Sequence, residues 1–284
     1  MQVQLAELAT ALTAESIPVV VLKGAYLAHI VYPSLALRDM QDIDLLVPRE
    51  HLDRVTAVAL ARGYTPLRPF LVEQEAAAMH HLTRLEKPDA LSIEIHWNIT
   101  TPNQIYSINP TILWTHAVPV QIAGSGVLGL SAEHLLLHLC AHVSYQHGFE
   151  FWIRSLVDIA TTIHRFDGEL DWQFVEHQCR AWSWQRGVHL TLYLARELLG
   201  AAVPNDLLDT LSFSAIALAH HGNSSRHRSV CRSAVSGRSF SLARQARPNS
   251  MAAATSSSSV QTPVSTASAR SGWLSIRSAV AQLI

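Results

Sequence analysis

The sequence predicts an α/β domain over residues 1–125 and an α-helical domain over residues 126–218. In the first part, short runs rich in β-branched residues alternate with helical periods, which is typical of a sheet covered by helices. From Ser131 onward only helical periods remain. A chain of 284 residues is long enough to bury two cores of this kind.

The first predicted elements are a helix, a strand and a second, shorter helix. Apolar residues at helical spacing predict a helix over residues 2–16. The run IPVVVL predicts a buried strand over residues 17–22, because it is apolar and rich in β-branched side chains. Lys23 and Gly24 break this strand, and a helix follows over residues 25–32, until a proline stops it.

A second strand, a helix and a hairpin complete the α/β part. The second strand is predicted over residues 42–47, and a helix follows over residues 49–62 with Gly63 as its C-cap. Two further runs, residues 80–86 and 91–97, are separated by Lys-Pro-Asp-Ala, which has the composition of a turn. We therefore expect a β-hairpin there.

The second domain is expected to contain only helices, and a tail of different composition follows it. The predicted helices cover residues 131–147, 150–166, 171–181, 184–199 and 205–218. No Asp or Glu follows Asp209, and Ser and Arg dominate residues 219–284. Such a composition cannot bury enough apolar surface to offset chain entropy, so a disordered or frameshifted tail is expected. A basic arm that binds nucleic acid is the alternative.

Composition narrows the classes of function. The formal net charge is −1, so no overall basic field indicates nucleic acid, and DNA is not expected as a partner. The cysteines Cys140, Cys179 and Cys231 form no CxxC pair and fit a reducing cytosol. The N-terminus lacks the pattern of a signal peptide, and no run reaches the ~18 apolar residues of a membrane span. A cytoplasmic protein with no membrane partner is therefore expected.

Two acidic residues lie two positions apart on the second predicted strand. Residues i and i+2 of a strand face the same side, so Asp42 and Asp44 should share a face while Ile43 and Leu45 enter the core. Two neighbouring carboxylates repel each other. A divalent cation, Mg²⁺ or Mn²⁺, would remove this conflict and would serve phosphoryl transfer. The alternative is a strand end with two solvated acids.

The segment upstream of this pair fits phosphate chemistry. Lys23 and Gly24 lie between a strand and a helix N-terminus, where backbone N–H groups and the helix dipole favour an anion. Lys23 adds a positive charge, and Arg38, in the loop before the Asp42 strand, is a candidate phosphate contact. The alternative is an ordinary turn between a strand and a helix.

Glu94 is the candidate third carboxylate. Polar and apolar residues alternate in LSIEIHW, residues 91–97, which places Glu94 on the polar face with Ser92 and His96. If this strand lies beside that of Asp42, Glu94 would complete a metal site and accept the proton of an attacking hydroxyl. The alternative is a surface acid on an amphipathic strand.

Taken in order, these segments resemble the DNA polymerase β-like nucleotidyltransferases, in which a glycine turn precedes a DxD pair and a later acidic strand. The sequence is more similar still to a bacterial family of uncharacterised nucleotidyltransferases with the pattern LKG, Y, R, DIDLLV, GY and (D/E)xHW, followed by helices. The matching segments are Leu22–Gly24, Tyr32, Arg38, Asp42–Val47, Gly63–Tyr64 and Glu94–Trp97. The resemblance covers about residues 3–215. It implies an α/β minimal nucleotidyltransferase fold with a mixed sheet, followed by a helical domain.

The resemblance also implies a reaction, the two-metal transfer of a nucleoside monophosphate from an NTP to an unknown hydroxyl acceptor. The acceptor is a small molecule or a macromolecule, and Mg²⁺ or Mn²⁺ is the expected cofactor. The expected catalytic and metal-binding residues are Asp42, Asp44 and Glu94, and the expected substrate-binding residues are Lys23, Gly24 and Arg38. One departure from the superfamily is Ala25, which replaces the usual serine after the glycine. The alternative function is a catalytically inactive module that binds a nucleotide or a partner.

A glycine-rich segment outside this pattern has a structural interpretation. Gly124–Gly129 matches the dinucleotide-binding pattern GxGxxG letter for letter. However, Pro119 interrupts the preceding strand candidate, and no second strand follows to form a βαβ unit. A flexible linker between the domains is therefore expected.

Histidines and an acid–base pair on the predicted helices also have structural interpretations. His134, His138 and His142 recur every four residues on an apolar helix, where packing is a simpler explanation than a zinc site. A substrate contact by His138 or His142, and a metal hydrolase that uses the histidines, are the alternatives. Arg154 and Asp158 are expected to form an ion pair along one helix.

Overall fold

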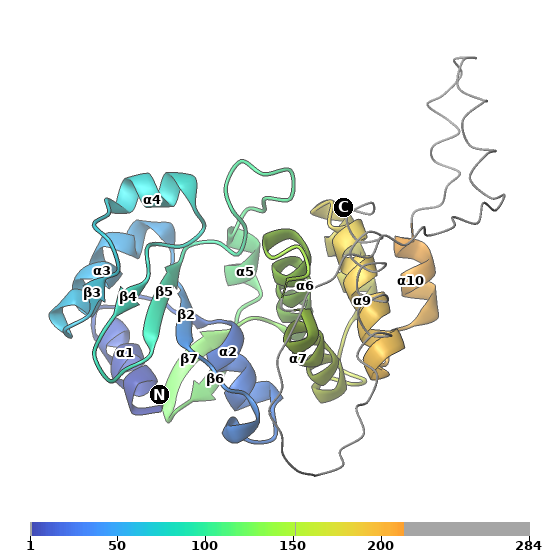
Figure 1. Cartoon of the computed structure of the whole chain (residues 1–284), viewed down its shortest axis with the longest axis horizontal. Helices are drawn as coiled ribbons and strands as arrows, with labels where there is room; N and C mark the ends of the chain where they lie inside the picture. The colour runs from blue at the N-terminus through green and yellow to red at the C-terminus, as the bar shows by residue number, and fades with distance from the viewer. Residues whose placement is uncertain (1, 151, 213–284) are drawn as a thin grey trace, which may run out of the picture. The chain divides into compact units, whose positions relative to one another are not determined.

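A mixed seven-stranded sheet forms the first part of the computed structural model, which describes residues 2–150 and 152–212 (Figure 1). Along the sheet the strand order is β3-β4-β5-β2-β1-β7-β6. The strands are β1 Val20–Val21, β2 Asp42–Leu46, β3 Thr65–Pro66, β4 Leu85–Glu86, β5 Ser92–His96, β6 Val118–Ile122 and β7 Ser125–Gly129. The expectations for residues 219–284 lie outside the described residues.

The central strands β1 and β2 are the most deeply buried, because helices and neighbouring strands enclose them. β2 pairs with β1 in antiparallel and with β5 in parallel orientation, and β1 also pairs with β7 in parallel. Ile43, Leu45 and Leu46 of β2 are all buried, as are Val20 and Val21 of β1. The expected mixed sheet is therefore confirmed.

The helices of the sheet part pack against these strands. They are α1 Gln2–Ala14, α2 Lys23–Tyr26, α3 Leu52–Ala61, α4 Val72–Ala78 and α5 Thr111–Thr115. α2 continues as a π-helical turn over Leu27–Val31, and a 3₁₀ turn over Arg49–His51 precedes α3. α1 contacts α3 and β7, while α2 packs on β2. The helix N-terminus at Lys23 therefore begins next to the strand that carries the DxD pair.

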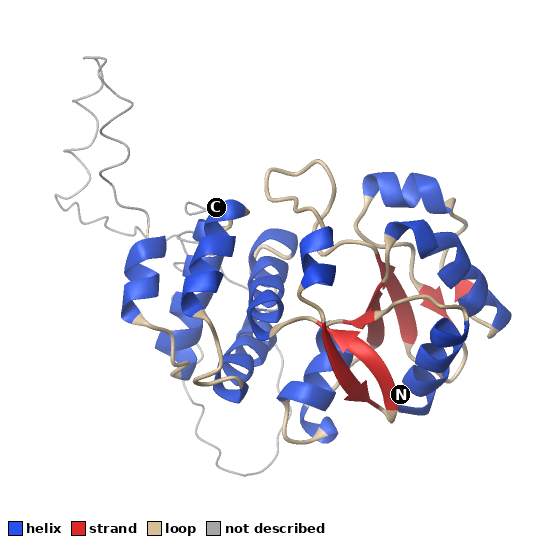
Figure 2. Ribbon diagram, turned by 180° about the vertical axis from the view of Figure 1, so that it is seen from behind, coloured by secondary structure: helices blue, strands red, loops and turns tan. Residues whose placement is uncertain are grey.

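The second part consists of helices without strands (Figure 2). They are α6 Ala132–Ala141, α7 Trp152–Arg165, α8 Trp172–Ala181, α9 Gln185–Leu199 and α10 Asn205–Leu211, and α6 continues as a π-helical turn over His142–Gln146. Ser131 caps α6 by accepting a hydrogen bond from a backbone N–H, and Asp171 caps α8 in the same way. α6, α7 and α9 contact one another and form the centre of this part. Among the described residues no helix is long and apolar enough to cross a membrane.

The expected linker at Gly124–Gly129 is wrong, because this segment forms strand β7 of the sheet. β6 and β7 form an antiparallel hairpin, with the turn at Ala123 and Gly124, which both have positive φ. Pro119 is accommodated in β6 because this strand lies at the edge of the sheet. At such an edge the N–H that proline lacks is not needed for a hydrogen bond between strands. The prediction of a linker considered only whether this segment belongs to a βαβ unit, and a hairpin strand does not meet that criterion.

Candidate active site

Asp44 and Glu94 lie side by side on neighbouring parallel strands. β2 pairs with β5 in a register that joins Asp42 to Ser92 and Asp44 to Glu94. Paired residues of neighbouring strands face the same side of a sheet, so the alternation within each strand brings the two carboxylates together. The expected pairing of these strands is confirmed, while the catalytic roles of their residues stay predictions.

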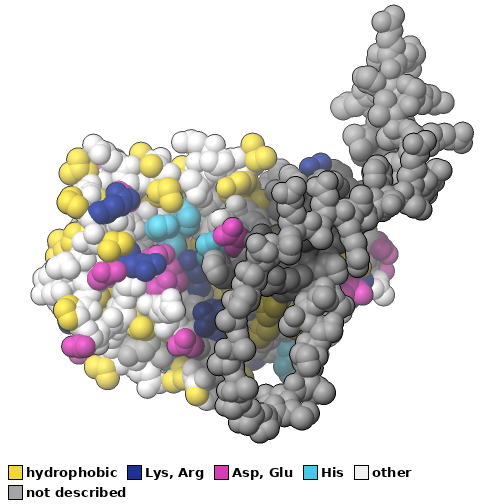
Figure 3. Space-filling view, in the orientation of Figure 1, with side chains coloured by type: hydrophobic (Ala, Val, Ile, Leu, Met, Phe, Trp, Pro, Cys, Tyr) yellow, Lys and Arg dark blue, Asp and Glu magenta, His cyan; other side chains and the backbone are white. Residues whose placement is uncertain are grey.

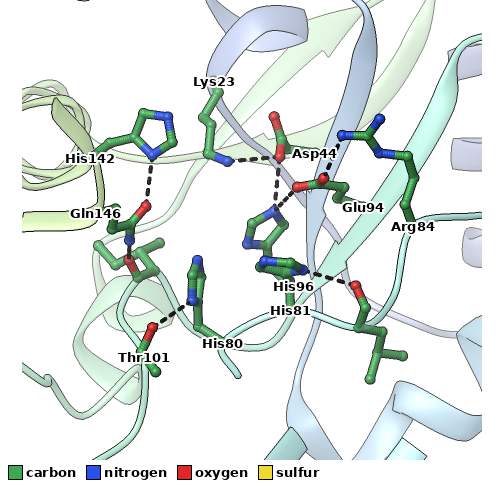
Figure 4. A network of polar contacts seen from close by, with 12 residues as sticks. Lys23, Asp44, His80, His81, Arg84, Glu94, His96, Thr101, His142 and Gln146 are labelled. Carbon is green, nitrogen blue, oxygen red and sulfur yellow. Dashed lines mark hydrogen bonds and ion pairs between the residues drawn. The ribbon is translucent and has the colours of Figure 1, made fainter. Parts of the chain in front are cut away.

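Asp44 lies at the centre of the polar network in Figure 4. Its side chain is buried, and its Oδ1 accepts hydrogen bonds from Lys23 Nζ at 2.9 Å and from His96 Nε2 at 2.8 Å. Burial raises the pKa of the Asp44 carboxyl, but the Lys23 ammonium and the His96 hydrogen bond outweigh burial and hold this pKa well below its usual range. Asp44 is therefore a carboxylate at neutral pH, which is the form that binds a cation.

Glu94 is held by two further groups. Its Oε1 lies 3.4 Å from Arg84 Nη2, and its Oε2 lies 3.7 Å from His96 Nε2. Burial and the neighbouring Asp44 carboxylate raise the pKa of Glu94, but the interactions with His96 and Lys23 together lower it more, and the net result is a pKa of about 2. A carboxylate of this kind is well suited to bind a metal and less suited to accept a proton.

Asp42 lies on the same face, but its pKa is shifted upward, in the opposite direction to those of Asp44 and Glu94. Its side chain is half-buried, and burial raises its pKa. The neighbouring carboxylates of Asp44 and Glu94 raise the pKa of Asp42 further, and Lys23 compensates only in part. A cation bound between these carboxylates would relieve their repulsion.

One compact group of possible metal ligands occurs within residues 2–150 and 152–212. It consists of one atom each from Asp44, Glu94 and His96, and these atoms all lie within 4.8 Å of one another. Two carboxylates and an imidazole are a donor set that fits a divalent cation. Asp42 lies outside this compact group, and His96 is a member that was not predicted. The alternation of β5 was the available signal, since it placed His96 on the same face as Glu94.

Lys23 and Gly24 begin α2 at the edge of the site. The Lys23 side chain is only 14% exposed and is bound to Asp44. Burial lowers the pKa of Lys23, but Asp44 and the other carboxylates raise it more, so the ammonium is retained. A Cβ on Gly24 would lie 3.3 Å from the Cβ of Met40, so this turn packs closely against the loop that precedes β2. Phosphate binding by this turn stays a prediction.

Arg38 joins the loop before β2 to the helical part. Its Nε and Nη2 donate to Asp158 Oδ1 and Oδ2 at 2.7 and 2.9 Å, and the Tyr32 hydroxyl donates to Oδ1 at 2.8 Å. The predicted ion pair between Arg154 and Asp158 is wrong, because Arg38 occupies both oxygens of Asp158. Arg154 instead lies 3.8 Å from the carboxylate of Asp39.

The histidines of the α6 stripe have separate environments. His134 is buried and packs against the rings of Phe174 and Trp182, as the packing interpretation predicts. His138 is also buried, and burial together with the nearby Lys23 ammonium holds its pKa well below the usual value. His142 lies beyond α6 in the π-helical turn.

Two histidines beside the site were missed by sequence reasoning. The rings of His80 and His81 lie 5.5 and 5.2 Å from the ring of His96, and His81 forms an isolated β-bridge with His96. Burial is the main cause that lowers the pKa of His80 to about 2, so its ring is neutral. The only signal was their place in the predicted hairpin, opposite Glu94 to Trp97. Figure 3 shows acidic, basic and histidine side chains gathered next to one another on one face.

Comparisons with known proteins show the family of the chain. The sequence profile of the family described as "Uncharacterised nucleotidyltransferase" matches residues 1–200. Among curated proteins, none matches the sequence.

Three solved structures are similar to the chain only at the level of the backbone. A solution structure of the antibiotic-resistance factor ANT(2'')-Ia has 13% identity, a TM-score of 0.41 and coverage of 78% of this chain and 95% of its own. A crystal structure of ANT(2'')-Ia with adenylyl-2''-tobramycin has 14% identity, a TM-score of 0.43 and coverage of 64% and 96%. An antigenic nucleotidyltransferase-like protein from Paracoccidioides brasiliensis has 14% identity, a TM-score of 0.42 and coverage of 74% and 91%.

All three structures share 14% identity or less with this chain. The family match, in contrast, spans the whole sheet part and most of the helical part. The chain therefore belongs to the family of uncharacterised nucleotidyltransferases.

Proposed function

We propose that this chain transfers a nucleoside monophosphate from an NTP to a hydroxyl acceptor and releases pyrophosphate. The acceptor oxygen would form a bond to the α-phosphorus, and the bond from the α-phosphorus to the oxygen that bridges to the β-phosphate would break. The observation that carries this assignment is the placement of Glu94 directly beside Asp44, with Asp42 on the same face. Family membership supports the transferase class.

The three carboxylates would hold Mg²⁺ or Mn²⁺. Asp42 and Asp44 would be shared ligands, and Glu94 would complete the site, with His96 either coordinating as well or holding Asp44 in place. The bound ions would neutralise charge on the phosphates and on the attacking oxygen. We also assign the acceptor's proton to Glu94. This role would require the contact between Glu94 and His96 to loosen when substrate binds, because the interactions with His96 and Lys23 keep Glu94 a weak base.

Positive charge from the turn and the loop would bind the triphosphate. Lys23 would move from Asp44 to a phosphate when a metal takes over the charge of Asp44. The backbone N–H groups at Gly24 would contribute hydrogen bonds. Arg38 would bind phosphate only by leaving Asp158, so its role as a phosphate contact depends on a rearrangement of that pair. The helical part that follows β7 would supply the acceptor pocket.

The test is a transfer assay with two positions of the label. Full-length protein is incubated with Mn²⁺, a cell extract as the source of acceptor, and each NTP labelled on the α- or the γ-phosphate. The proposal predicts that the α-label enters an acceptor and the γ-label appears only in pyrophosphate. Asp44→Asn should abolish the incorporation of the α-label into the acceptor. Transfer of the γ-label to the acceptor would contradict the proposal.

One observation favours a second function, a module that binds nucleotide without catalysis. Ala25 follows Gly24 in α2, where related enzymes place a serine hydroxyl on a phosphate, and Ala25 is fully buried. This reading predicts metal-dependent NTP binding with no transfer to any acceptor. The same assay, combined with equilibrium binding of the NTP, therefore separates the two functions.

A further inference from the structure

A cavity of about 190 Å³ lies beside Lys23, on the side of the site that faces the helices. Its walls include Lys23 and Leu27 from the α2 segment, and His142, Glu150 and Ser155 from the helical part. The volume equals roughly six water molecules at ~30 Å³ each, which is about the size of one sugar ring. Lys23 links this cavity to the carboxylates, because its Nζ binds Asp44 while its side chain lines the cavity.

Hydrogen bonding fixes the tautomer of His142. The Gln146 amide nitrogen donates to the backbone oxygen of Ile99, and that oxygen can only accept, so the amide orientation is determined. The Gln146 Oε1 then faces His142 Nδ1 at 2.7 Å (Figure 4). Because an amide oxygen also only accepts, the proton must lie on Nδ1. The Nε2 of His142 therefore carries a lone pair.

This Nε2 is available to a bound molecule. Within the described part of the chain, no group hydrogen-bonds to His142 Nε2, and the atom is not among the buried atoms that lack a partner. Burial, followed by the nearby Lys23 ammonium, lowers the pKa of His142 to about 3, so the ring stays neutral at physiological pH. His142 thus presents a hydrogen-bond acceptor that does not become protonated.

Most charges around the cavity are paired within the protein. Lys23 is paired with Asp44, and Arg38 is paired with Asp158. Of the two remaining charged residues of the wall, Arg154 lies 3.8 Å from the carboxylate of Asp39, and Glu150 has no ion pair among the described residues. The wall therefore offers no unpaired positive charge to an anionic molecule, whereas hydroxyl groups can both donate and accept among these side chains.

We propose that this cavity binds the acceptor as a polyhydroxylated group without negative charge, of about the size of one sugar ring, with one hydroxyl donating to His142 Nε2. Gln146 is a positioning residue, since it holds His142 in the tautomer that accepts. The assignment rests on the proposed function. It places the acceptor in this cavity because Lys23 lines the cavity and also binds Asp44, one of the proposed metal ligands.

The test measures binding of small probes by full-length protein in the presence of Mn²⁺ and a non-hydrolysable NTP analogue. The probes are myo-inositol and methyl glucoside, which are neutral, and gluconate, which is anionic. We expect at least one neutral probe to bind and gluconate not to bind. His142→Phe should weaken binding of the neutral probe roughly 10- to 100-fold, the range for leaving a buried hydroxyl without a partner. In His142→Phe the affinities for Mn²⁺ and the analogue should change by less than about twofold. Their binding also shows that this variant is folded.

Gln146→Leu provides the second variant, because it keeps the imidazole and removes its restraint. Long-range ¹H–¹⁵N spectra should show the proton of His142 on Nδ1 in the unchanged protein and a mixture of tautomers in Gln146→Leu, with weaker probe binding. His164→Phe, the same substitution at an exposed position of α7, is the matched control and should change neither. Suppose that Mn²⁺ and the analogue bind to the unchanged protein. This inference is then overturned if no neutral probe binds, or if His142→Phe binds the probe as tightly as the unchanged protein does. If the unchanged protein binds neither Mn²⁺ nor the analogue, the proposed function is overturned instead.

Discussion

Replacing Asp158 by alanine should be among the most destabilising single changes in the described part of the chain. Asp158 is 3% exposed and accepts two hydrogen bonds from Arg38 and one from Tyr32. Its loss would leave the Arg38 guanidinium, whose side chain is 12% exposed, without a charged partner and with only the backbone oxygen of Asp39 as an acceptor. Breaking a buried pair from one side costs about 3–5 kcal/mol. For a unit of this size, each kcal/mol shifts Tm by about 2–4 °C, so a drop of roughly 6–20 °C is expected.

The assay is urea denaturation followed by circular dichroism, applied as a double-mutant cycle. The single variants of the cycle are Arg38→Met and Asp158→Leu. The double variant that combines them removes both charges and should cost less than either single change, because no buried charge is left unpaired. Arg154→Ala is the matched control on the same helix, since its exposed pair with Asp39 should be worth at most about 1 kcal/mol. If Asp158→Ala also cost less than about 1 kcal/mol, or if the two single changes were additive, the pair would not join the loop to α7 as described.

Three further predictions concern the metal, pH and packing. Mn²⁺ should raise Tm in a thermal melt, and the double variant Asp42→Asn with Asp44→Asn should abolish the increase. If Mn²⁺ raises the Tm of the double variant by the same amount, these carboxylates are not metal ligands. Burial lowers the pKa of His134 from 6.5 to about 4, so only the unfolded state binds this proton between those values. Stability is therefore fully present above about pH 6.5 and is lost as pH falls toward 4, by up to ~1.4 kcal/mol per pH unit, and His134→Gln should reduce this slope in denaturation curves. Gly129→Ala should cost about 1–3 kcal/mol, because the new Cβ would overlap the ring of Tyr26. Gly126→Ala on the same strand meets nothing closer than 3.4 Å and should be tolerated in the same measurement.

Local patterns were sufficient to predict the elements that carry the carboxylates. Alternation in residues 91–97 and the apolar run around Asp42 gave the two strands and the faces of their side chains, and the pairing register then brought Asp44 and Glu94 together. The long helices were also predictable, because their apolar periods extend over several turns.

Features that depend on distant partners could not be predicted in this way. The Arg38–Asp158 pair joins residues 120 positions apart, so the local i, i+4 rule favoured Arg154 instead. Strand β1 pairs over only two residues although six apolar residues suggested a longer strand, because pairing depends on where its neighbours end. His80 and His81 lie near His96 only through the hairpin, and no local pattern distinguishes them from ordinary strand residues.

The most direct test of the central claim is the effect of Glu94→Gln on transfer and on binding, measured in the same preparation. The substitution keeps the size of the side chain and removes the charge that would complete the metal site and accept a proton. The account predicts that transfer of the α-label falls by ~100-fold or more, while NTP binding weakens far less, since Lys23, Gly24 and the two aspartates remain. Transfer near the original rate in Glu94→Gln would contradict the account, because the third carboxylate would then lie elsewhere.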